Sequence, residues 1–119
     1  MSKPLRIYVS GPLSSDTDEG MFENCQRAVD VGIELMQKGH YAIIPHLSLW
    51  TNIRAEVKHG IMFDWDWWMK LDLDLLECCE ALYFIGSSRG ADIELARAIE
   101  LGLQIFYSLD EVPEVGEAA

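Results

Sequence analysis

The sequence is poor in basic residues, and this limits the partners it can have. Its 119 residues include 9 Lys and Arg against 20 Asp and Glu, which gives a formal net charge of −11. Proteins that bind nucleic acid gather Lys and Arg on one face to neutralise phosphates. We therefore expect no nucleic-acid partner, whereas a small anionic ligand needs only one local site.

Cysteine, clustered histidine and long apolar runs are also scarce. Three cysteines, two of them the adjacent Cys78 and Cys79, cannot form a disulfide framework, and they have neither the spacing nor the histidine partners of a zinc site. The apolar run at 7–9 is far shorter than a signal-peptide core or a membrane span requires. The sequence thus predicts a soluble, cytoplasmic protein with no metal and no membrane partner.

Two nucleotide-binding motifs are missing as well. No Gly-x-x-x-x-Gly-Lys and no Gly-x-Gly-x-x-Gly segment occurs, which argues against a Walker-type phosphate loop and a dinucleotide fingerprint. The run Phe84-Ile85-Gly86 ends without an aspartate. A response-regulator phosphoacceptor is therefore excluded too.

What the sequence does contain is an alternation of strand-like and helix-like segments, with 50% hydrophobic residues to fill one core. Short apolar or β-branched runs predict strands at residues 5–10, 41–44, 81–85 and 104–108. Helical spacing of apolar residues predicts helices at 22–38, 63–79 and 91–101. Residues 46–60 have a mixed character, which we interpret as a loop with one irregular helix.

Strands separated by helices of this length predict right-handed crossovers and a parallel sheet. We expect an α/β fold, a single Rossmann-like (flavodoxin-like) domain with a parallel sheet of four to five strands and helices on both faces. The domain would span residues 1–109, followed by a loose acidic C-terminal tail at 110–119. Ligands of such folds sit at the carboxyl ends of the strands.

Glu94 is the first candidate for chemistry at that edge. We expect it in the first turn of the helix after the third strand, where free backbone N–H groups and the helix dipole favour an ionised carboxylate. An ionised and fixed carboxylate can act as a covalent nucleophile. The simpler interpretation is that acids are common in first helical turns only because the dipole favours them.

Asp72 and Tyr8 are candidates because of their neighbours. Asp72 falls inside the apolar stripe of the 63–79 helix, where a carboxylate is costly unless it has a partner or borders a wet cleft. Tyr8 shares one face of the first strand with Ser10, and a buried phenol needs a hydrogen-bond partner. The alternatives are a semi-buried structural acid and a core tyrosine bonded to a backbone carbonyl.

A small turn after the third strand is a candidate anion site. Ser87, Ser88 and Gly90 lie at the start of a helix, where hydroxyl and N–H groups can hold an anion. His46, directly after the second strand, would reach the same edge of the sheet. Both features also have plainer interpretations, as generic loop chemistry and as a structural histidine.

Several short motifs follow one another in a fixed order over about residues 5–108. They are Tyr8-Val9-Ser10-Gly11-Pro12, Gly39-His40, Ile44-Pro45-His46, Asp72 seven residues before Cys79-Glu80, Ser88-Arg89-Gly90-Ala91, Glu94, Ala98 and Leu101-Gly102. In order and spacing they resemble the nucleoside 2-deoxyribosyltransferase superfamily. The nearest resemblance is to its small phage and bacterial members of unknown function and to the deoxynucleoside 5′-monophosphate N-glycosidases.

This resemblance implies an enzyme that cleaves the bond between a base and deoxyribose, with water or a second base as acceptor. Glu94 matches the nucleophilic glutamate that forms a glycosyl-enzyme, and Tyr8 matches the tyrosine that orients it. Asp72 matches the aspartate that handles a sugar hydroxyl or protonates the departing base. Ser88 stands where the monophosphate-specific branch holds the 5′-phosphate.

The resemblance also implies the surroundings of the reaction. The small-molecule nucleoside or nucleotide would be bound by Ser10, Gly11, His46 and Gly90 in addition to Ser88. The protein would need no cofactor and would work as a homodimer or a larger homo-oligomer.

Two features depart from the family pattern. The loop at 13–19 is more acidic than a phosphate-binding loop should be, and the aromatic stretch at 50–68 has no counterpart. That stretch would line the base pocket or contact another subunit.

Two other classes of function therefore stay open. One is a non-catalytic nucleotide-binding or signalling module of the same fold, and the other is an assembly protein whose Trp65, Trp67 and Trp68 face a partner.

Overall fold

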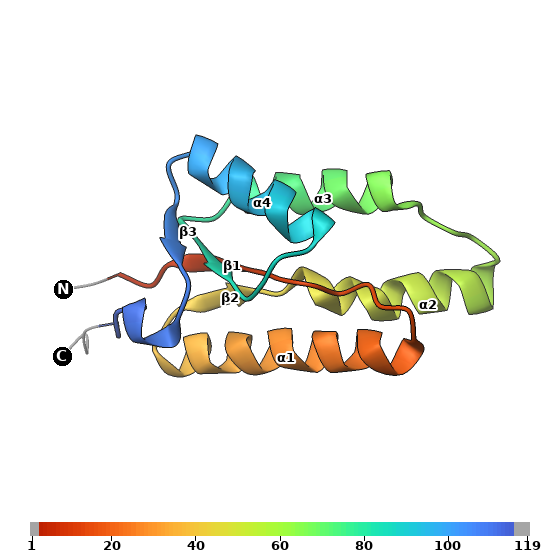
Figure 1. Cartoon of the computed structure of the whole chain (residues 1–119), viewed down its shortest axis with the longest axis horizontal. Helices are drawn as coiled ribbons and strands as arrows, with labels where there is room; N and C mark the ends of the chain where they lie inside the picture. Colours follow the sequence, from red (N-terminus) through yellow and green to blue (C-terminus); the bar gives the residue numbers. More distant parts are fainter. Residues whose placement is uncertain (1–2, 116–119) are drawn as a thin grey trace.

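The chain folds around a four-stranded parallel sheet with the strand order β2-β1-β3-β4 (Figure 1). A computed structural model describes residues 3–115. The expected architecture, an α/β fold of one Rossmann-like domain with an all-parallel sheet, is confirmed. The strands are β1 (Arg6–Ser10), β2 (Tyr41–Ile43), β3 (Ala81–Phe84) and β4 (Gln104–Phe106). The helices are α1 (Asp18–Gln37), α2 (Ser48–His59), α3 (Trp65–Glu77) and α4 (Arg89–Glu100), with short 3-10 helices η1 (Pro45–Leu47) and η2 (Leu109–Glu111).

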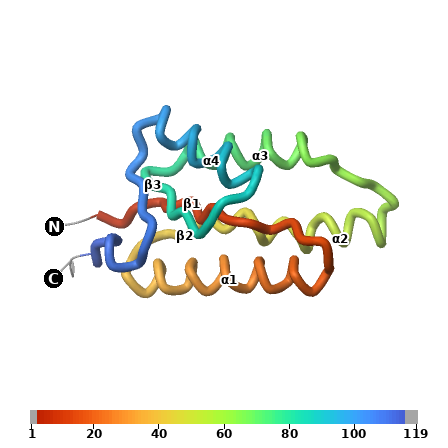
Figure 2. Tube along the Cα trace, viewed as in Figure 1, coloured from red at the N-terminus to blue at the C-terminus, as the bar shows by residue number. Residues whose placement is uncertain are grey.

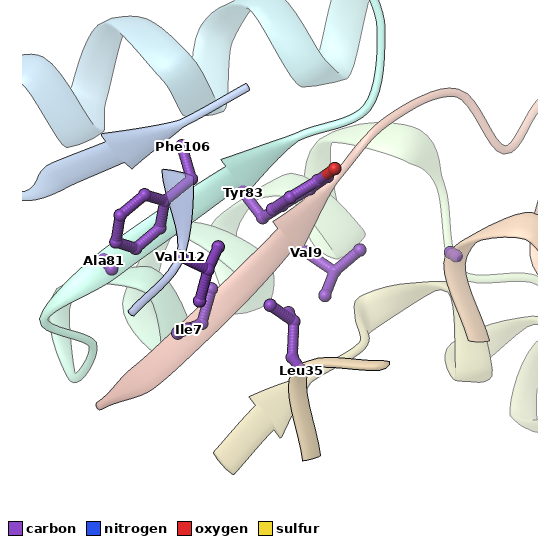
Figure 3. Packing of buried hydrophobic residues seen from close by; sticks show 8 residues of the cluster. Ile7, Val9, Leu35, Ala81, Tyr83, Phe106 and Val112 are labelled. Atoms are coloured by element: carbon purple, nitrogen blue, oxygen red, sulfur yellow. The ribbon is translucent and has the colours of Figure 1, made fainter. Parts of the chain in front are cut away.

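The two faces of the sheet are covered by different helices. α1 covers one face, and α3 and α4 lie side by side over the other (Figure 1). The alternation of side chains along β1 explains the division, because Ile7 and Val9 enter the core with Leu35 of α1 while Tyr8 packs with Leu76 of α3. Figure 3 shows the first of these cores. The alternation predicted for the first strand is thus confirmed.

Capping residues set where the helices begin. Thr17 accepts a hydrogen bond from the N–H of Gly20, so α1 begins before the first apolar residue of its stripe. Asp64 caps α3 in the same way, and this helix begins two residues later than its apolar pattern predicted.

Residues 48–59, which we had interpreted as irregular, form the regular helix α2, which ends at Gly60 in the left-handed conformation (φ 65°). None of the described helices is long and apolar enough to cross a membrane.

β1 and β3 end side by side at one edge of the sheet. Ser10 pairs with Phe84, and the N–H of Ile85 donates to the carbonyl of Ser10 at 2.7 Å. Gly11 follows at the point of closest approach, where a Cβ atom would lie 2.8 Å from Cβ of Ile85. Beyond this edge, α2 and the α2–α3 connection extend the molecule to 50 × 27 × 23 Å (Figure 2).

The segment from Asp110, which we expected to be loose, is packed as far as residue 115. Val112 is 2% exposed and belongs to the core that Figure 3 shows. The N–H of Val115 donates to the carbonyl of Lys38 at 2.8 Å, and His40 Nε2 lies 2.6 Å from the carbonyl oxygen of Pro113. The expectation was wrong for this part because one buried valine outweighs an acidic composition. Residues 116–119 of the expected tail lie outside the described residues.

Replacing Val112 with Ala is expected to lower the free energy of unfolding by about 1–2 kcal/mol, because two methyl groups leave the core. Ile99→Val is the control, since the Ile99 side chain on α4 is 59% exposed, and it should change stability by less than about 0.5 kcal/mol. Urea unfolding followed by circular dichroism measures both. Equal effects of the two substitutions would show that the segment after β4 adds no stability.

Candidate functional site

A cavity of about 360 Å³ lies at the carboxyl edge of the sheet, bordered by the loop after β1, by η1 and α2, and by the first halves of α3 and α4. Most of the residues that the sequence placed at the site line this cavity. They are Gly11, His46, Asp72, Ser88, Gly90 and Glu94. Of the other three, Ser87 does not line the cavity, whereas Tyr8 and Ser10 are fully buried and contact the cavity through Glu94.

Glu94 is a buried carboxylate held by two hydroxyl groups of β1. It is 6% exposed, and it accepts hydrogen bonds from Tyr8 Oη to Oε2 (2.6 Å) and from Ser10 Oγ to Oε1 (2.7 Å). Tyr8 and Ser10 are two positions apart in a strand, so both face α4. Because each carboxylate oxygen accepts a hydrogen bond, the side chain is fixed and the two bonds favour its ionised form against the effect of burial.

The structure changes the reason for expecting an ionised Glu94. α4 begins at Arg89 after the Ser88 cap, so the first-turn acid is Asp92 and Glu94 lies in the second turn. The helix dipole acts mainly within the first turn. The hydroxyl groups of β1, rather than the helix dipole, therefore stabilise the ionised carboxylate of Glu94.

The two acids of the cavity titrate differently from free carboxyl groups. Burial raises the pKa of Glu94, and the hydrogen bonds from Tyr8 and Ser10 act against this rise. Burial, followed by the negative charge of Glu94, raises the pKa of Asp72 from 3.8 to about 7. Two hydroxyl groups donate to Glu94, whereas no side chain among residues 3–115 donates to Asp72, so we assign the negative charge to Glu94 and the proton to Asp72 up to about pH 7. The pair supplies one ionised and one protonated carboxyl group.

Tyr8 remains a hydrogen-bond donor throughout this titration. Burial raises the pKa of its phenol first, and the charges of Glu94 and Asp72 raise it further. An ionised phenol beside two acids would be strongly disfavoured. The phenol of Tyr8 can therefore donate to Glu94 at every pH at which Glu94 is ionised.

Asp72→Asn is expected to stabilise the protein at neutral and alkaline pH. The pKa of Asp72 is about 7 in the folded state and near 3.8 in the unfolded state. Ionisation of Asp72 therefore leaves the free energy of unfolding unchanged below about pH 4 and lowers it by the full amount above about pH 7. The free energy of unfolding of the unsubstituted protein should therefore fall relative to the variant between these limits, by about 2 kcal/mol at pH 8 after allowance for solvent screening. Urea unfolding at pH 4, 6 and 8 measures this difference. A difference that does not vary with pH would contradict the raised pKa.

His46 lines the cavity and has a buried acceptor atom that no hydrogen bond satisfies within the described part of the chain. It is 3% exposed, and its Nε2 lies 3.0 Å from the carbonyl oxygen of Gly11. A carbonyl oxygen only accepts, so Nε2 carries the proton and Nδ1 carries a lone pair. Within the described part of the chain, Nδ1 has no hydrogen-bond partner. Burial lowers the pKa of His46, which keeps the ring neutral, so it combines a structural link to the loop after β1 with a free acceptor.

The turn after β3 is only in part the anion cradle that the sequence suggested. Ser88 lines the cavity, and its Oγ caps α4 by accepting the N–H of Ala91 at 3.1 Å. Its hydroxyl proton is still available to a ligand. Ser87 is engaged elsewhere, because its hydroxyl donates to the carboxylate of Asp92 at 2.8 and 2.9 Å. Gly90 lines the cavity as expected.

The aromatic stretch that had no assigned place forms a wall of the cavity. Phe63, Trp65 and Trp68 border it, whereas Trp67 stacks on Phe63 with 4.5 Å between ring centroids. The Nε1 atom of Trp68 is a buried donor without a partner among residues 3–115. The cavity thus combines an aromatic wall with unsatisfied polar atoms, as is typical of small-molecule sites.

Arg89 lines the cavity, although no pattern in the sequence marked it as a candidate. It borders the cavity as the first residue of α4, and its Cζ atom lies 4.1 Å from the ring centroid of Trp65, the first residue of α3. The signal in the sequence was a cation inside a Ser-Gly turn of a strongly acidic chain. Its contact with Trp65 depends on the packing of α3 against α4, which no local pattern encodes.

The fold and the site define a flavodoxin-like α/β domain with a pair of acids in a cavity at the carboxyl edge of its sheet. Among the described residues, no group of three His, Cys, Asp or Glu side chains is placed to hold a metal ion. The chain belongs to the family described as Domain of unknown function (DUF4406), whose model matches residues 5–107. This match covers all four strands and the four α-helices. None of the curated proteins matches the chain.

Proposed function

We propose that this protein cleaves the N-glycosidic bond of a deoxynucleoside or of a deoxynucleoside 5′-monophosphate. The observation that carries the proposal is the pair of acids, since Glu94 is held by two hydroxyl groups and borders the same cavity as Asp72, whose pKa is about 7. Cleavage through a glycosyl-enzyme requires one ionised nucleophile and one proton donor beside the same bond. The motifs shared with the nucleoside 2-deoxyribosyltransferase superfamily support the same roles.

In the first step, a carboxylate oxygen of Glu94 attacks C1′ of the deoxyribose and forms an ester bond to it. The bond from C1′ to the base nitrogen breaks, its electron pair stays on the base, and Asp72 donates its proton to the departing base. Tyr8 and Ser10 keep the carboxylate of Glu94 in place and are positioning residues. The aromatic wall gives the base a surface on which to stack.

In the second step, the ionised Asp72 accepts a proton from a water molecule that attacks C1′. The ester bond breaks, deoxyribose leaves with the new hydroxyl group, and Glu94 and Asp72 return to their starting protonation states. Attack by a nitrogen of a second base in place of water would make the same cycle a transfer reaction.

We also propose that the protein works in the cytoplasm as a homodimer or a larger homo-oligomer. Large apolar side chains are exposed on α2 and just after it, with Trp50 at 56%, Val57 at 79% and Met62 at 78%. Grouped exposed apolar side chains are typical of interaction surfaces. Light scattering coupled to size-exclusion chromatography measures the mass in solution, and a monomer at every concentration would contradict this part of the proposal.

The test of the reaction is to incubate the protein with a panel of deoxynucleosides and their 5′-monophosphates and to measure free base by chromatography. We expect base release from at least one member of the panel. A substrate analogue with slow second-step chemistry should leave the mass of its sugar on the peptide that contains Glu94. Binding without base release from any member would contradict the enzyme and favour the non-catalytic nucleotide-binding module.

A further inference from the structure

The cavity repels anions unless a cation offsets its acids. Asp72 and Glu94 both line it, and the whole chain carries a formal charge of −11. His46 is neutral because burial lowers its pKa. Among the described residues that line the cavity, the only Lys or Arg is Arg89. Within this lining, Arg89 is therefore the one side chain that can place a full positive charge against a negatively charged ligand.

Arg89 is placed to bind an anion rather than to neutralise a neighbouring acid. The ion pairs of arginines in residues 3–115 involve Arg6 and Arg97, and none involves Arg89. Its guanidinium Cζ lies 4.1 Å from the centroid of the Trp65 ring, a cation–π contact that positions the group and leaves its N–H groups available to a ligand. The planar N–H groups of arginine match two oxygens of a phosphate at once.

The spacing between Arg89 and the nucleophile suits a phosphorylated sugar. The two residues are five positions apart in α4, a rise of about 7.5 Å along the helix axis. That rise is comparable with the length of a pentose that carries a 5′-phosphate. Ser88, whose hydroxyl proton is free, lies directly beside Arg89 and borders the same cavity.

A second observation points to a polar ligand in this cavity. His46 is 3% exposed, and its Nδ1 acceptor has no partner within the described part of the chain. A buried acceptor without a partner is costly, and a ligand hydroxyl or N–H group would satisfy it. A phosphorylated deoxynucleoside offers such a donor together with the anion.

We infer that Arg89, held on Trp65, is the specificity-determining residue that makes deoxynucleoside 5′-monophosphates the preferred substrates over free deoxynucleosides. The inference rests on the proposed function and names its substrate class. Sequence motifs had assigned the 5′-phosphate to Ser88 alone, whereas the structure gives the charge-bearing part of that role to Arg89.

The test measures binding without turnover, in a protein that carries Glu94→Gln. Calorimetric titration gives the Kd of a deoxynucleoside and of its 5′-monophosphate. We expect the monophosphate to bind about 10- to 100-fold more tightly than the deoxynucleoside, as for a charge-assisted pair of hydrogen bonds. Adding Arg89→Met should remove this advantage and leave the Kd of the deoxynucleoside unchanged. Arg89→Lys should keep part of the advantage, since it keeps the charge but not the planar group.

Arg97→Met is the matched control. It removes one arginine from the same helix, but Arg97 pairs with Glu77 and does not line the cavity. If Arg89→Met and Arg97→Met weaken binding of the monophosphate equally, the inference is overturned. It is also overturned if Arg89→Met weakens binding of the deoxynucleoside as much as binding of the monophosphate. A monophosphate preference without base release would contradict only the proposed reaction, whereas base release without that preference would contradict only the role of Arg89. Failure to bind either ligand would contradict both.

Discussion

Replacing Glu94 with Gln is expected to lower the rate of base release at least about 10³-fold while the fold stays intact. Glutamine has the same shape and can still accept a hydrogen bond from Tyr8 or Ser10, but its amide cannot form the ester bond to C1′. Burial raises the pKa of Glu94, so the neutral side chain should not destabilise the folded state at pH 8. Chromatography of the released base measures the rate, and thermal unfolding checks the fold.

Glu100→Gln is the matched control for this substitution. It removes a carboxylate from the same helix at a side chain that is 68% exposed, and it should change the rate by less than about twofold. If Glu94→Gln retains the full rate with an unchanged unfolding temperature, Glu94 is not the nucleophile. If both variants lose activity equally, the loss reflects the charge of α4 rather than the chemistry of one carboxylate.

Asp72→Asn is expected to lower base release about 10²- to 10³-fold and to change its dependence on pH. A general acid must carry its proton, so the rate of the unsubstituted protein should fall as the pH rises through about 7, the pKa of Asp72. Asparagine does not titrate, so the remaining activity of the variant should lack this fall. Measuring kcat/KM between pH 5 and pH 9 for both proteins gives the two profiles.

Asp74→Asn provides the control, since Asp74 is an exposed acid on the same helix and does not line the cavity. Its profile should match that of the unsubstituted protein. A fall near pH 7 that persists in Asp72→Asn would show that another group donates the proton. Asp72 would then take the other role that the sequence resemblance allows, which is to bind a sugar hydroxyl.

The arrangement of strands and helices was predictable because each element is encoded by its own local pattern. The apolar run before Gly86 predicted β3, and the stripe between residues 22 and 38 predicted most of α1. Two segments were misjudged because their local composition is ambiguous. α2 is rich in polar residues and buries only Leu49 and Ala55, and acidic residues surround Val112, whose burial depends on the core that β1, β3 and β4 form.

The candidate residues were also within reach of the sequence, although their partners were not. Tyr8 and Ser10 stood out by their shared face of β1, and Asp72 by its place in an apolar stripe. Arg89 was overlooked because its importance comes from a contact with Trp65, which belongs to another helix. The position of Glu94 within α4 was off by one turn because the Ser88 cap starts the helix earlier than its apolar stripe.

The sequence by itself determined the order of strands and helices, the side of β1 that carries hydroxyl groups, and the identity of the acids that end near one edge of the sheet. Periodicity and capping act between near neighbours, so one chain segment contains all the information they need. Only the tertiary structure decided that the hydroxyl groups of β1 reach both oxygens of Glu94, across separations of 86 and 84 residues. It also decided that Asp72 keeps its proton to about pH 7 and that the turn after β3 contributes a cation as well as a serine. Burial and electrostatic interaction depend on distances through space, which are set only when the segments pack together.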